Sequence, residues 1–273
     1  MSATVPPLLR VGDLRVVYGK AAALEGVSFE VAQGQLFGLI GPNGAGKTTL
    51  IETVTGFVRE DRGEVVFAGE RMNGLRPEQR ARRGLARTFQ SLELFEELTV
   101  LENLLVAGDR GGWRSHVVDL VRPGRVEATG KVAETMALLG ISELSGALPT
   151  QLSNGQRKLV ALGRALASGA RMMMLDEPAA GLDTNESREL GRHLRELTDR
   201  GCTMLLVDHD MDLVLSISDR VLVLDFGRAI AEGTPEEIRT APRVVEAYLG
   251  AHVTTATGAG DGAGGGPRGG GDG

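Results

Sequence analysis

The chain has 273 residues, of which 42% are hydrophobic, and it carries a formal net charge of −6. This length can bury a substantial core, and the acidic balance argues against nucleic acid as the main partner. The single cysteine, Cys202, cannot form an intrachain disulfide, and no stretch reaches the roughly 18 apolar residues of a membrane-spanning helix. Residues 1–7 lack the pattern of a secretory signal, so a reducing, cytosolic setting is expected.

The first predicted elements are strands. Residues 8–18 and 27–31 alternate between apolar and polar side chains, and the apolar run Leu36–Ile40 predicts a buried parallel strand. Tyr18 ends the first of these strands and is one of only two tyrosines. Its ring could stack on an adenine, or it could be a strand-end aromatic on the core.

Residues 41–48 connect the buried strand to a helix-like segment and match the Gly-x-x-x-x-Gly-Lys-Thr pattern of a phosphate-binding loop. The glycines let the backbone turn tightly and point its N–H groups at a phosphate, and the following helix adds its positive dipole end. Lys47 can reach the outer phosphates, and Thr48 offers a hydroxyl to Mg²⁺. The sequence therefore predicts a site for a nucleoside triphosphate.

The middle of the chain changes character. Residues 63–67 and 84–90 are predicted strands, and a short basic helix is expected at 77–83. The arginines of that helix could form a nucleic-acid patch, but a solvated face is the preferred interpretation; they are Arg80, Arg82 and Arg83. Apolar spacing is mostly helical from 99 to 167, although 108–130 is irregular. We expect a helical subdomain at about 91–167, inserted into an α/β core.

Strands resume at 171–178, 202–207 and 220–224, and closing helices are expected at 235–239 and 244–249. Asp183 and Glu186 form a capping-box pattern at the start of another helix. The alternation of strands and helices favours a mainly parallel sheet. Residues 1–250 form the predicted folded unit, and the Gly-rich tail at 251–273 is expected to be disordered.

The predicted strand at 172–175 ends in Asp176 and Glu177. Three consecutive methionines start it, and because side chains alternate between the faces of a strand they cannot converge on one soft metal ion. An apolar strand that ends in Asp, after a phosphate-binding loop, suits a carboxylate that holds Mg²⁺. Glu177 can act as general base towards the attacking water. The alternative, an ordinary strand-end turn, is weaker beside such a loop.

Residues 152–156, Leu-Ser-Asn-Gly-Gln, resemble the signature sequence of the ABC (ATP-binding cassette) ATPases, usually written Leu-Ser-Gly-Gly-Gln. Ser153 would cap a helix whose N-terminus can face a γ-phosphate. His209 follows an apolar strand, where that family carries its switch histidine, and Asp208 before it is expected to matter little. With Tyr18, Gln90 and Asp183, the family's motifs follow in order from about residue 8 to 249.

The resemblance implies an α/β P-loop core with a mainly parallel sheet, an antiparallel β part near the N-terminus and an inserted helical subdomain. It also implies the cofactors ATP and Mg²⁺. Tyr18 would stack on adenine, and the phosphates would lie in a cradle made of Gly41, Pro42, Asn43, Gly44, Ala45, Gly46, Lys47, Thr48 and Thr49. Thr48, Gln90 and Asp176 would surround Mg²⁺, while Glu177 and His209 would be catalytic. The ATP site of a second cassette, in a homodimer or heterodimer, would be completed by Ser153, Asn154, Gly155, Gln156 and Asp183.

Several further segments resemble the ATPase subunits of branched-chain amino-acid importers, namely residues 86–90, 94–95, 99–107, 178–182, 209–214, 217–220, 233–235 and 248–250. The resemblance implies a peripheral protein on the cytoplasmic face of the cell membrane that energises uptake. Its partners would be two membrane permeases, docked near residues 90–98, and indirectly an extracytoplasmic solute-binding protein. Two alternative functions remain open, the ATPase subunit of an importer for urea or amides and that of an exporter. A soluble ABC ATPase without a role in transport is less favoured, because such proteins usually carry a second cassette or a long coiled-coil insertion, and this sequence shows neither. No residue reads out the solute.

Overall fold

The computed structural model describes residues 6–88, 94–108 and 126–248. Three of the sequence predictions therefore lie outside the described residues: the role of Gln90, most of the irregular segment at 108–130, and the tail at 251–273. Within the described ranges, no helix is both long and apolar enough to cross a membrane.

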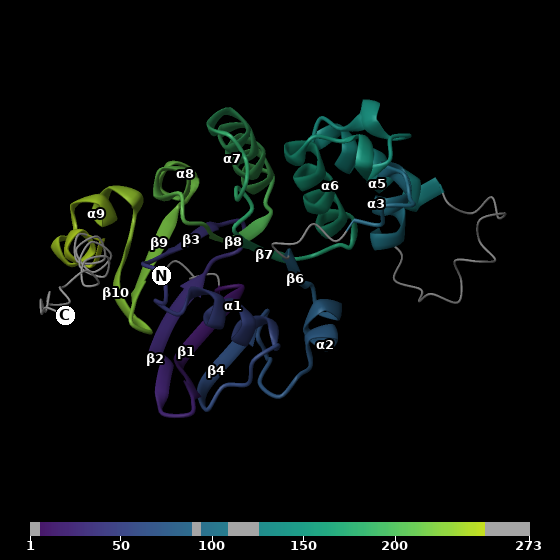
Figure 1. Cartoon of the computed structure of the whole chain (residues 1–273). Helices are drawn as coiled ribbons and strands as arrows, with labels where there is room; N and C mark the ends of the chain where they lie inside the picture. The colour runs from purple at the N-terminus through teal and green to yellow at the C-terminus, as the bar shows by residue number, and fades with distance from the viewer. Residues whose placement is uncertain (1–5, 89–93, 109–125, 249–273) are drawn as a thin grey trace, which may run out of the picture.

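Strands in the described residues form two sheets (Figure 1). The antiparallel sheet runs in the order β2–β1–β4–β5, made of β1 (Leu9–Tyr18), β2 (Ala21–Val31), β4 (Arg62–Phe67) and β5 (Glu70–Arg71). The other sheet runs β10–β9–β3–β8–β7–β6, made of β3 (Leu36–Ile40), β6 (Leu85–Thr88), β7 (Met172–Asp176), β8 (Thr203–Val207), β9 (Arg220–Asp225) and β10 (Arg228–Gly233). Only β10 pairs antiparallel in this sheet. The predicted fold class is confirmed.

Helices cover both faces of the mainly parallel sheet (Figure 1). On one side lie α1 (Lys47–Thr55) and the antiparallel sheet, and on the other lie α6 (Asn154–Ala167), α7 (Thr184–Asp199), α8 (Met211–Ile217) and α9 (Pro235–Thr240). The strand side chains alternate between these two cores. Met172 and Met174 pack on the α1 side and Met173 packs on the opposite side, so the three methionines do not converge.

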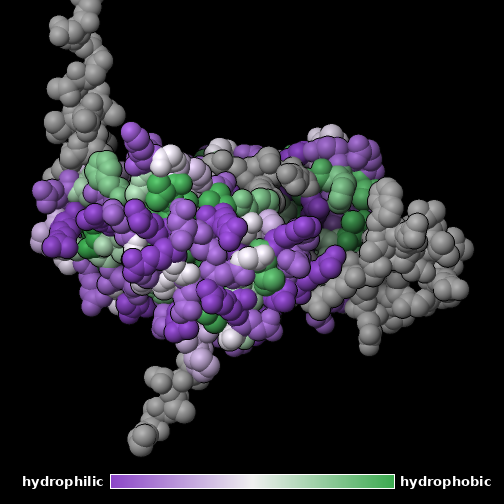
Figure 2. All heavy atoms as spheres, turned by 90° about the horizontal axis from the view of Figure 1, so that it is seen from below, coloured by the Kyte–Doolittle hydropathy of each residue, from purple (hydrophilic) through white to green (hydrophobic). Residues whose placement is uncertain are grey.

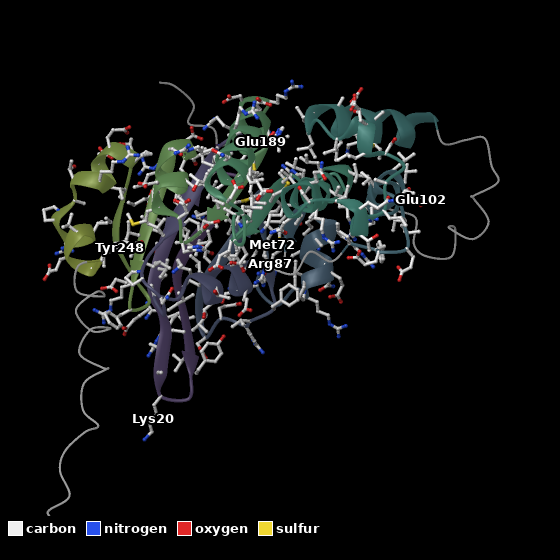
Figure 3. The ribbon with its side chains drawn as sticks, turned by 45° about the horizontal axis from the view of Figure 1, so that its top comes forward. Lys20, Met72, Arg87, Glu102, Glu189 and Tyr248 are labelled. Carbon is white, nitrogen blue, oxygen red and sulfur yellow. The ribbon has the colours of Figure 1, made fainter. Side chains whose placement is uncertain are left out.

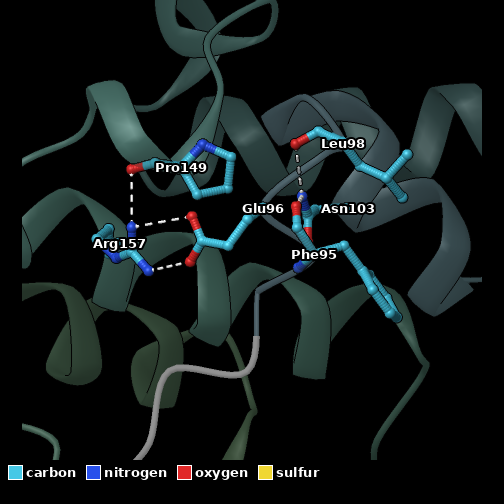
Figure 4. A network of polar contacts seen from close by, with 6 residues as sticks. All are labelled: Phe95, Glu96, Leu98, Asn103, Pro149 and Arg157. Atoms are coloured by element: carbon cyan, nitrogen blue, oxygen red, sulfur yellow. Dashed lines mark hydrogen bonds and ion pairs between the residues drawn. The ribbon is translucent and has the colours of Figure 1, made fainter.

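Between β6 and β7 the described chain is helical. It contains α3 (Val100–Gly108), α5 (Val126–Leu138), the short 3₁₀ turns Ser142–Leu144 and Pro149–Gln151, and α6. Asn103 of α3 is buried and fixes the preceding loop, because its side chain donates to the carbonyls of Phe95 and Leu98, both at 3.0 Å (Figure 4). In the same loop Glu96 forms an ion pair with Arg157 of α6. The segment that follows residues 89–93 is thus anchored to α6.

The short basic helix is α2 (Pro77–Arg82), and here one expectation was wrong. Arg82 and Arg83 are exposed, but Arg80 is buried, with 2% of its surface accessible. Its guanidinium donates to the carbonyls of Thr53 and Val54, at 2.8 and 2.7 Å, at the C-terminal end of α1. The last carbonyls of a helix have no partner within the helix, so a buried cation satisfies them.

Candidate functional site

The phosphate-binding loop leaves the C-terminal end of β3 and enters α1 at Lys47. Gly46 is the N-cap of α1 and has a φ of 102°, which favours glycine. A Cβ atom at Gly46 would lie 2.5 Å from the carbonyl oxygen of Ala23, and one at Gly41 would lie 2.2 Å from that of Leu224. These two positions therefore need glycine, whereas a Cβ at Gly44 would meet open space.

Lys47 folds back over this loop. Its Nζ donates to the carbonyl oxygens of Gly41 at 2.7 Å and Pro42 at 3.0 Å. Burial lowers the pKa of Lys47, and the nearby carboxylates of Glu177 and Asp176 act in the opposite direction. The ammonium thus lies between the loop backbone and the two acids, where a polyphosphate would bring further negative charge.

Asp176 and Glu177 lie at the end of β7, as the sequence predicts. Asp176 is buried, and its Oδ2 accepts a hydrogen bond from Arg87 Nη2 at 2.9 Å. Glu177 has a φ of 49°, and its N–H donates to the carbonyl of Val207 on β8 at 2.7 Å. Ala68, outside the site, has a similar φ of 53°, so it is the position of Glu177 beside Asp176 that makes it a candidate for function. The sequence reasoning missed Arg87, although a charged residue in a predicted strand was a visible signal.

These groups suit a nucleoside triphosphate with Mg²⁺. A Cβ at Gly44 would meet open space, and the N-terminus of α1 directly follows the loop, so backbone N–H groups are available to an anion there. Thr48, the second residue of α1, offers a hydroxyl, and Asp176 offers a carboxylate. Both are hard oxygen ligands of the kind that Mg²⁺ prefers.

Asp208 has a structural role that the sequence analysis had dismissed. It is buried, and its two oxygens accept from the backbone N–H groups of Ala179, at 3.0 Å, and Asp210, at 3.1 Å. It therefore holds the turn after Glu177 against the end of β8. His209 follows it, with its side chain 64% exposed and its Nδ1 3.4 Å from Asp208 Oδ1.

The signature residues begin α6. Ser153 is the N-cap, its Oγ accepting from the N–H of Gln156, and the Gln156 side chain accepts from the N–H of Ser153 at 2.9 Å. The predicted cap is confirmed. Asn154, which stands where the usual motif has glycine, donates from Nδ2 to the carbonyl of Gly181 at 2.9 Å. The signature is thus tied to residues 180–183 of the same chain, and Asp183 caps α7 as predicted.

Tyr18 lies at the end of β1 with 53% of its surface exposed, so the interpretation as a core aromatic is wrong. It pairs with Ala21 of β2, and Ala23, two residues further, contacts Gly46 of the phosphate-binding loop. Lys20 marks the tip of this hairpin in Figure 3. The exposed ring therefore stands on the hairpin that touches the phosphate-binding loop.

The structure groups the predicted residues into two sets. The loop, Asp176 and Glu177 meet around α1, which contacts α2, β2, β6 and β7. The signature and Asp183 lie at the starts of α6 and α7, and α6 contacts α3, α5, α7 and β6. The two sets thus lie at the starts of different helices, the first at α1 and the second at α6 and α7.

Comparisons with known proteins agree on the family. Residues 24–180 match the model described as ABC transporter, and residues 230–254 match the model described as branched-chain amino acid ATP-binding cassette transporter. The chain is 40% identical to the high-affinity branched-chain amino acid transport ATP-binding protein LivG of Salmonella typhimurium, over 89% of this chain and 98% of the relative.

Two solved structures are similar as well. One is the ADP conformation of an ATP-binding cassette of an ABC transporter, at 35% identity and a TM-score of 0.80, covering 90% of this chain and all of that one. The other is the dimeric structure of a bacterial ABC transporter cassette, at 25% identity and a TM-score of 0.68, covering 83% and 98% of the two chains.

Proposed function

The chain belongs to the ATP-binding proteins of the ABC transporter family and is an ATPase, and from that premise we propose that it energises the uptake of branched-chain amino acids. The match of residues 230–254 to the branched-chain model carries this proposal, because it lies outside the general ABC match at 24–180. The alternatives are import of urea or an amide and export of a solute, and the test below distinguishes them from amino-acid uptake.

We propose the following roles at the nucleotide. The loop at 41–49 holds the phosphates, Lys47 moves from the loop carbonyls to the outer phosphates, and Tyr18 stacks on the adenine. Thr48 and Asp176, with Gln90, hold Mg²⁺, which neutralises charge on the phosphates when bound. Glu177 takes a proton from the attacking water, and His209 contacts the γ-phosphate.

The second set of residues serves a partner cassette in this proposal. Ser153, Gly155 and Gln156 face the γ-phosphate held by the other chain, and Asp183 lies at the seam. The separation of the two sets in one chain supports this reading, as does the dimeric relative. The partner is a second copy or a different cassette.

A permease contact is proposed at the docking groove, which borders the segment 90–98 predicted to receive the permease: the guanidinium carbon of Arg164, which lines the groove, lies 4.8 Å from the ring centroid of Phe95. We give this name to a groove of about 640 Å³ between the end of α1, α2, β6, α3 and α6, with walls that include Phe57, Glu78, Arg87 and Arg164. Phe57 is 53% exposed. Figure 2 shows the underside as mostly hydrophilic, with small hydrophobic groups that reach the surface between hydrophilic ones. A short permease helix with apolar and charged side chains fits such walls, and it would place the chain on the cytoplasmic membrane face.

The test is to purify the tagged chain from detergent-solubilised membranes of its own cell, and then to reconstitute the recovered complex in vesicles. We expect two polytopic permeases and a second cassette, with ATP-dependent uptake of leucine, isoleucine or valine when the matching binding protein is present. Uptake of urea or an amide instead, or recovery of a single exporter-type permease, would reject the substrate class. Recovery of ribosomal or DNA-repair proteins alone would reject transport.

A further inference from the structure

Arg87 lies where the docking groove meets the metal site. Figure 3 labels it near the centre of the view, and 10% of its side chain is exposed. Its Nη2 donates to Asp176 Oδ2 at 2.9 Å, and its Nη1 lies 3.9 Å from Oε1 of Glu52 on α1. Its guanidinium carbon lies 5.6 Å from the ring centroid of Phe57, and both Phe57 and Arg87 line the groove. One side chain thus contacts a carboxylate of the nucleotide site and an exposed aromatic of the groove.

The strand register explains why the side chain points there. Arg87 is opposite Met174 in the parallel pair of β6 and β7. Asp176 is two residues beyond Met174, so it projects from the same face of the sheet. Met174 packs in the core on the α1 side. Arg87, Asp176 and α1 therefore meet on one face.

The electrostatics favour a fixed arrangement. The side chains of Arg87 and Asp176 are only 10% and 8% exposed, so solvent screens their attraction weakly. A guanidinium has a planar fork of donors, which lets it bond a carboxylate while its face stacks on an aromatic ring. Arg87 therefore holds Asp176 through one of its two carboxylate oxygens, Oδ2.

We propose that Arg87 is a positioning residue: it orients Asp176 for Mg²⁺ and makes that orientation depend on what contacts Phe57 in the docking groove. A permease helix that moves the Phe57 ring alters the contact between this ring and the Arg87 guanidinium. The guanidinium then shifts, and its hydrogen bond to Asp176 changes. The second half of this inference rests on the proposed function, whereas the first half concerns this chain alone.

The first test measures metal binding without turnover. Mn²⁺ affinity is determined by electron paramagnetic resonance on the isolated chain with a non-hydrolysable ATP analogue. Partners of metal-binding carboxylates typically contribute about 10–100-fold to affinity, so Arg87→Met should weaken Mn²⁺ binding by about that factor. Arg87→Lys keeps the charge but loses the fork, and it should fall between Met and wild type. The control is Arg83→Met, which removes an exposed ion pair with Glu70. Unchanged Mn²⁺ affinity in either folded Arg87 variant overturns the proposal.

The second test measures the link to the groove in the assembled transporter. We expect the permease to change the Mg²⁺ concentration that the wild-type chain requires for ATP hydrolysis. Because Phe57 lines the groove, Phe57→Ala should weaken permease recovery, and in the complex that still forms it should abolish this change. Val245→Ala, an exposed apolar residue that does not line the groove, should behave as wild type. If the Phe57→Ala complex responds to the permease as wild type does, the link is refuted. If no permease binds the wild-type chain, the proposed function fails and the Mn²⁺ result still decides whether Arg87 positions Asp176.

Discussion

Two substitutions of Glu177 separate the effect of its strained backbone on stability from the effect of its carboxylate on ATP hydrolysis. Its φ of 49° lies in a region that costs a residue with a side chain roughly 1–2 kcal/mol, and the hydrogen bond to Val207 at 2.7 Å keeps the backbone there. Glycine relieves this strain but makes the unfolded chain more flexible, an opposing effect of about 0.4–1 kcal/mol. We predict that Glu177→Gly raises the free energy of unfolding by about 0.5–1 kcal/mol.

Glu177→Gln keeps the shape and the strained backbone but loses the carboxylate. We predict that its ATP hydrolysis falls by roughly 10²–10⁴-fold, the usual contribution of a general base, while ATP still binds because the loop and Lys47 are unchanged. Glu177→Gly should be equally inactive but should melt about 1–4 °C higher than wild type. The assays are phosphate release, nucleotide binding and thermal unfolding.

The control for strain is Ala68→Gly, at a φ of 53° in the turn between β4 and β5. It relieves a similar backbone conformation outside the nucleotide site and should keep full turnover. Near-normal hydrolysis by Glu177→Gln would reject the general base. A Glu177→Gly variant that melts below wild type would refute the strain argument.

Three further predictions concern other contacts. Arg80→Met should lower the free energy of unfolding in denaturant by about 3 kcal/mol, because its charged hydrogen bonds to buried carbonyls are lost. Its control is Arg82→Met on the exposed side of the helix, which should change this free energy by less than about 0.5 kcal/mol. Equal effects of the two substitutions would contradict the capping role of Arg80. Asn154→Ala should speed hydrogen exchange of the Leu182 amide by about two- to tenfold, since the tie to Gly181 is lost, and an unchanged rate would show that the tie is not formed. Burial raises the pKa of the Tyr248 hydroxyl to about 12, because the folded chain favours its neutral form. This contribution to the free energy of unfolding is fully present below pH 10, and it is lost as the pH rises from 10 towards 12. Tyr248→Phe should remove this part of the alkaline stability loss, which solvent screening of the partly exposed ring keeps well below about 2.7 kcal/mol, the equivalent of two pKa units. Identical pH profiles of the two proteins would exclude the effect.

The sequence predicted the parts of the site that depend on local signals. An apolar run bounded by glycine gave the exact range of β3, since both the run and the turn lie within a few residues. Asp183 and Ser153 were recognised as caps because a cap and its partner are three residues apart. Such features need no knowledge of the rest of the chain.

Residues whose partners lie far along the chain were misjudged or missed. Arg80 contacts a carbonyl 27 residues away, Asp208 an N–H 29 residues away, and Arg87 a carboxylate 89 residues away. Residue type alone cannot separate a solvated arginine from a buried one that caps a helix. The first half of β2 and all of β10 also escaped prediction, because these edge strands lack a regular apolar alternation and are defined by pairing with β1 and β9.

The contacts at the signature bear on how two cassettes would close. Asn154 ties the start of α6 to Gly181, and Asp208 ties Ala179 to the end of β8, so the signature and the turn after Glu177 are connected within one chain. In the proposed dimer, each chain therefore offers its partner's ATP a preassembled surface rather than a loop that must order on contact. Preorganised surfaces associate with a smaller entropic penalty. The same ties connect the residues offered to the partner's nucleotide with Glu177 at the chain's own nucleotide, so each of the two sites would be sensitive to the state of the other.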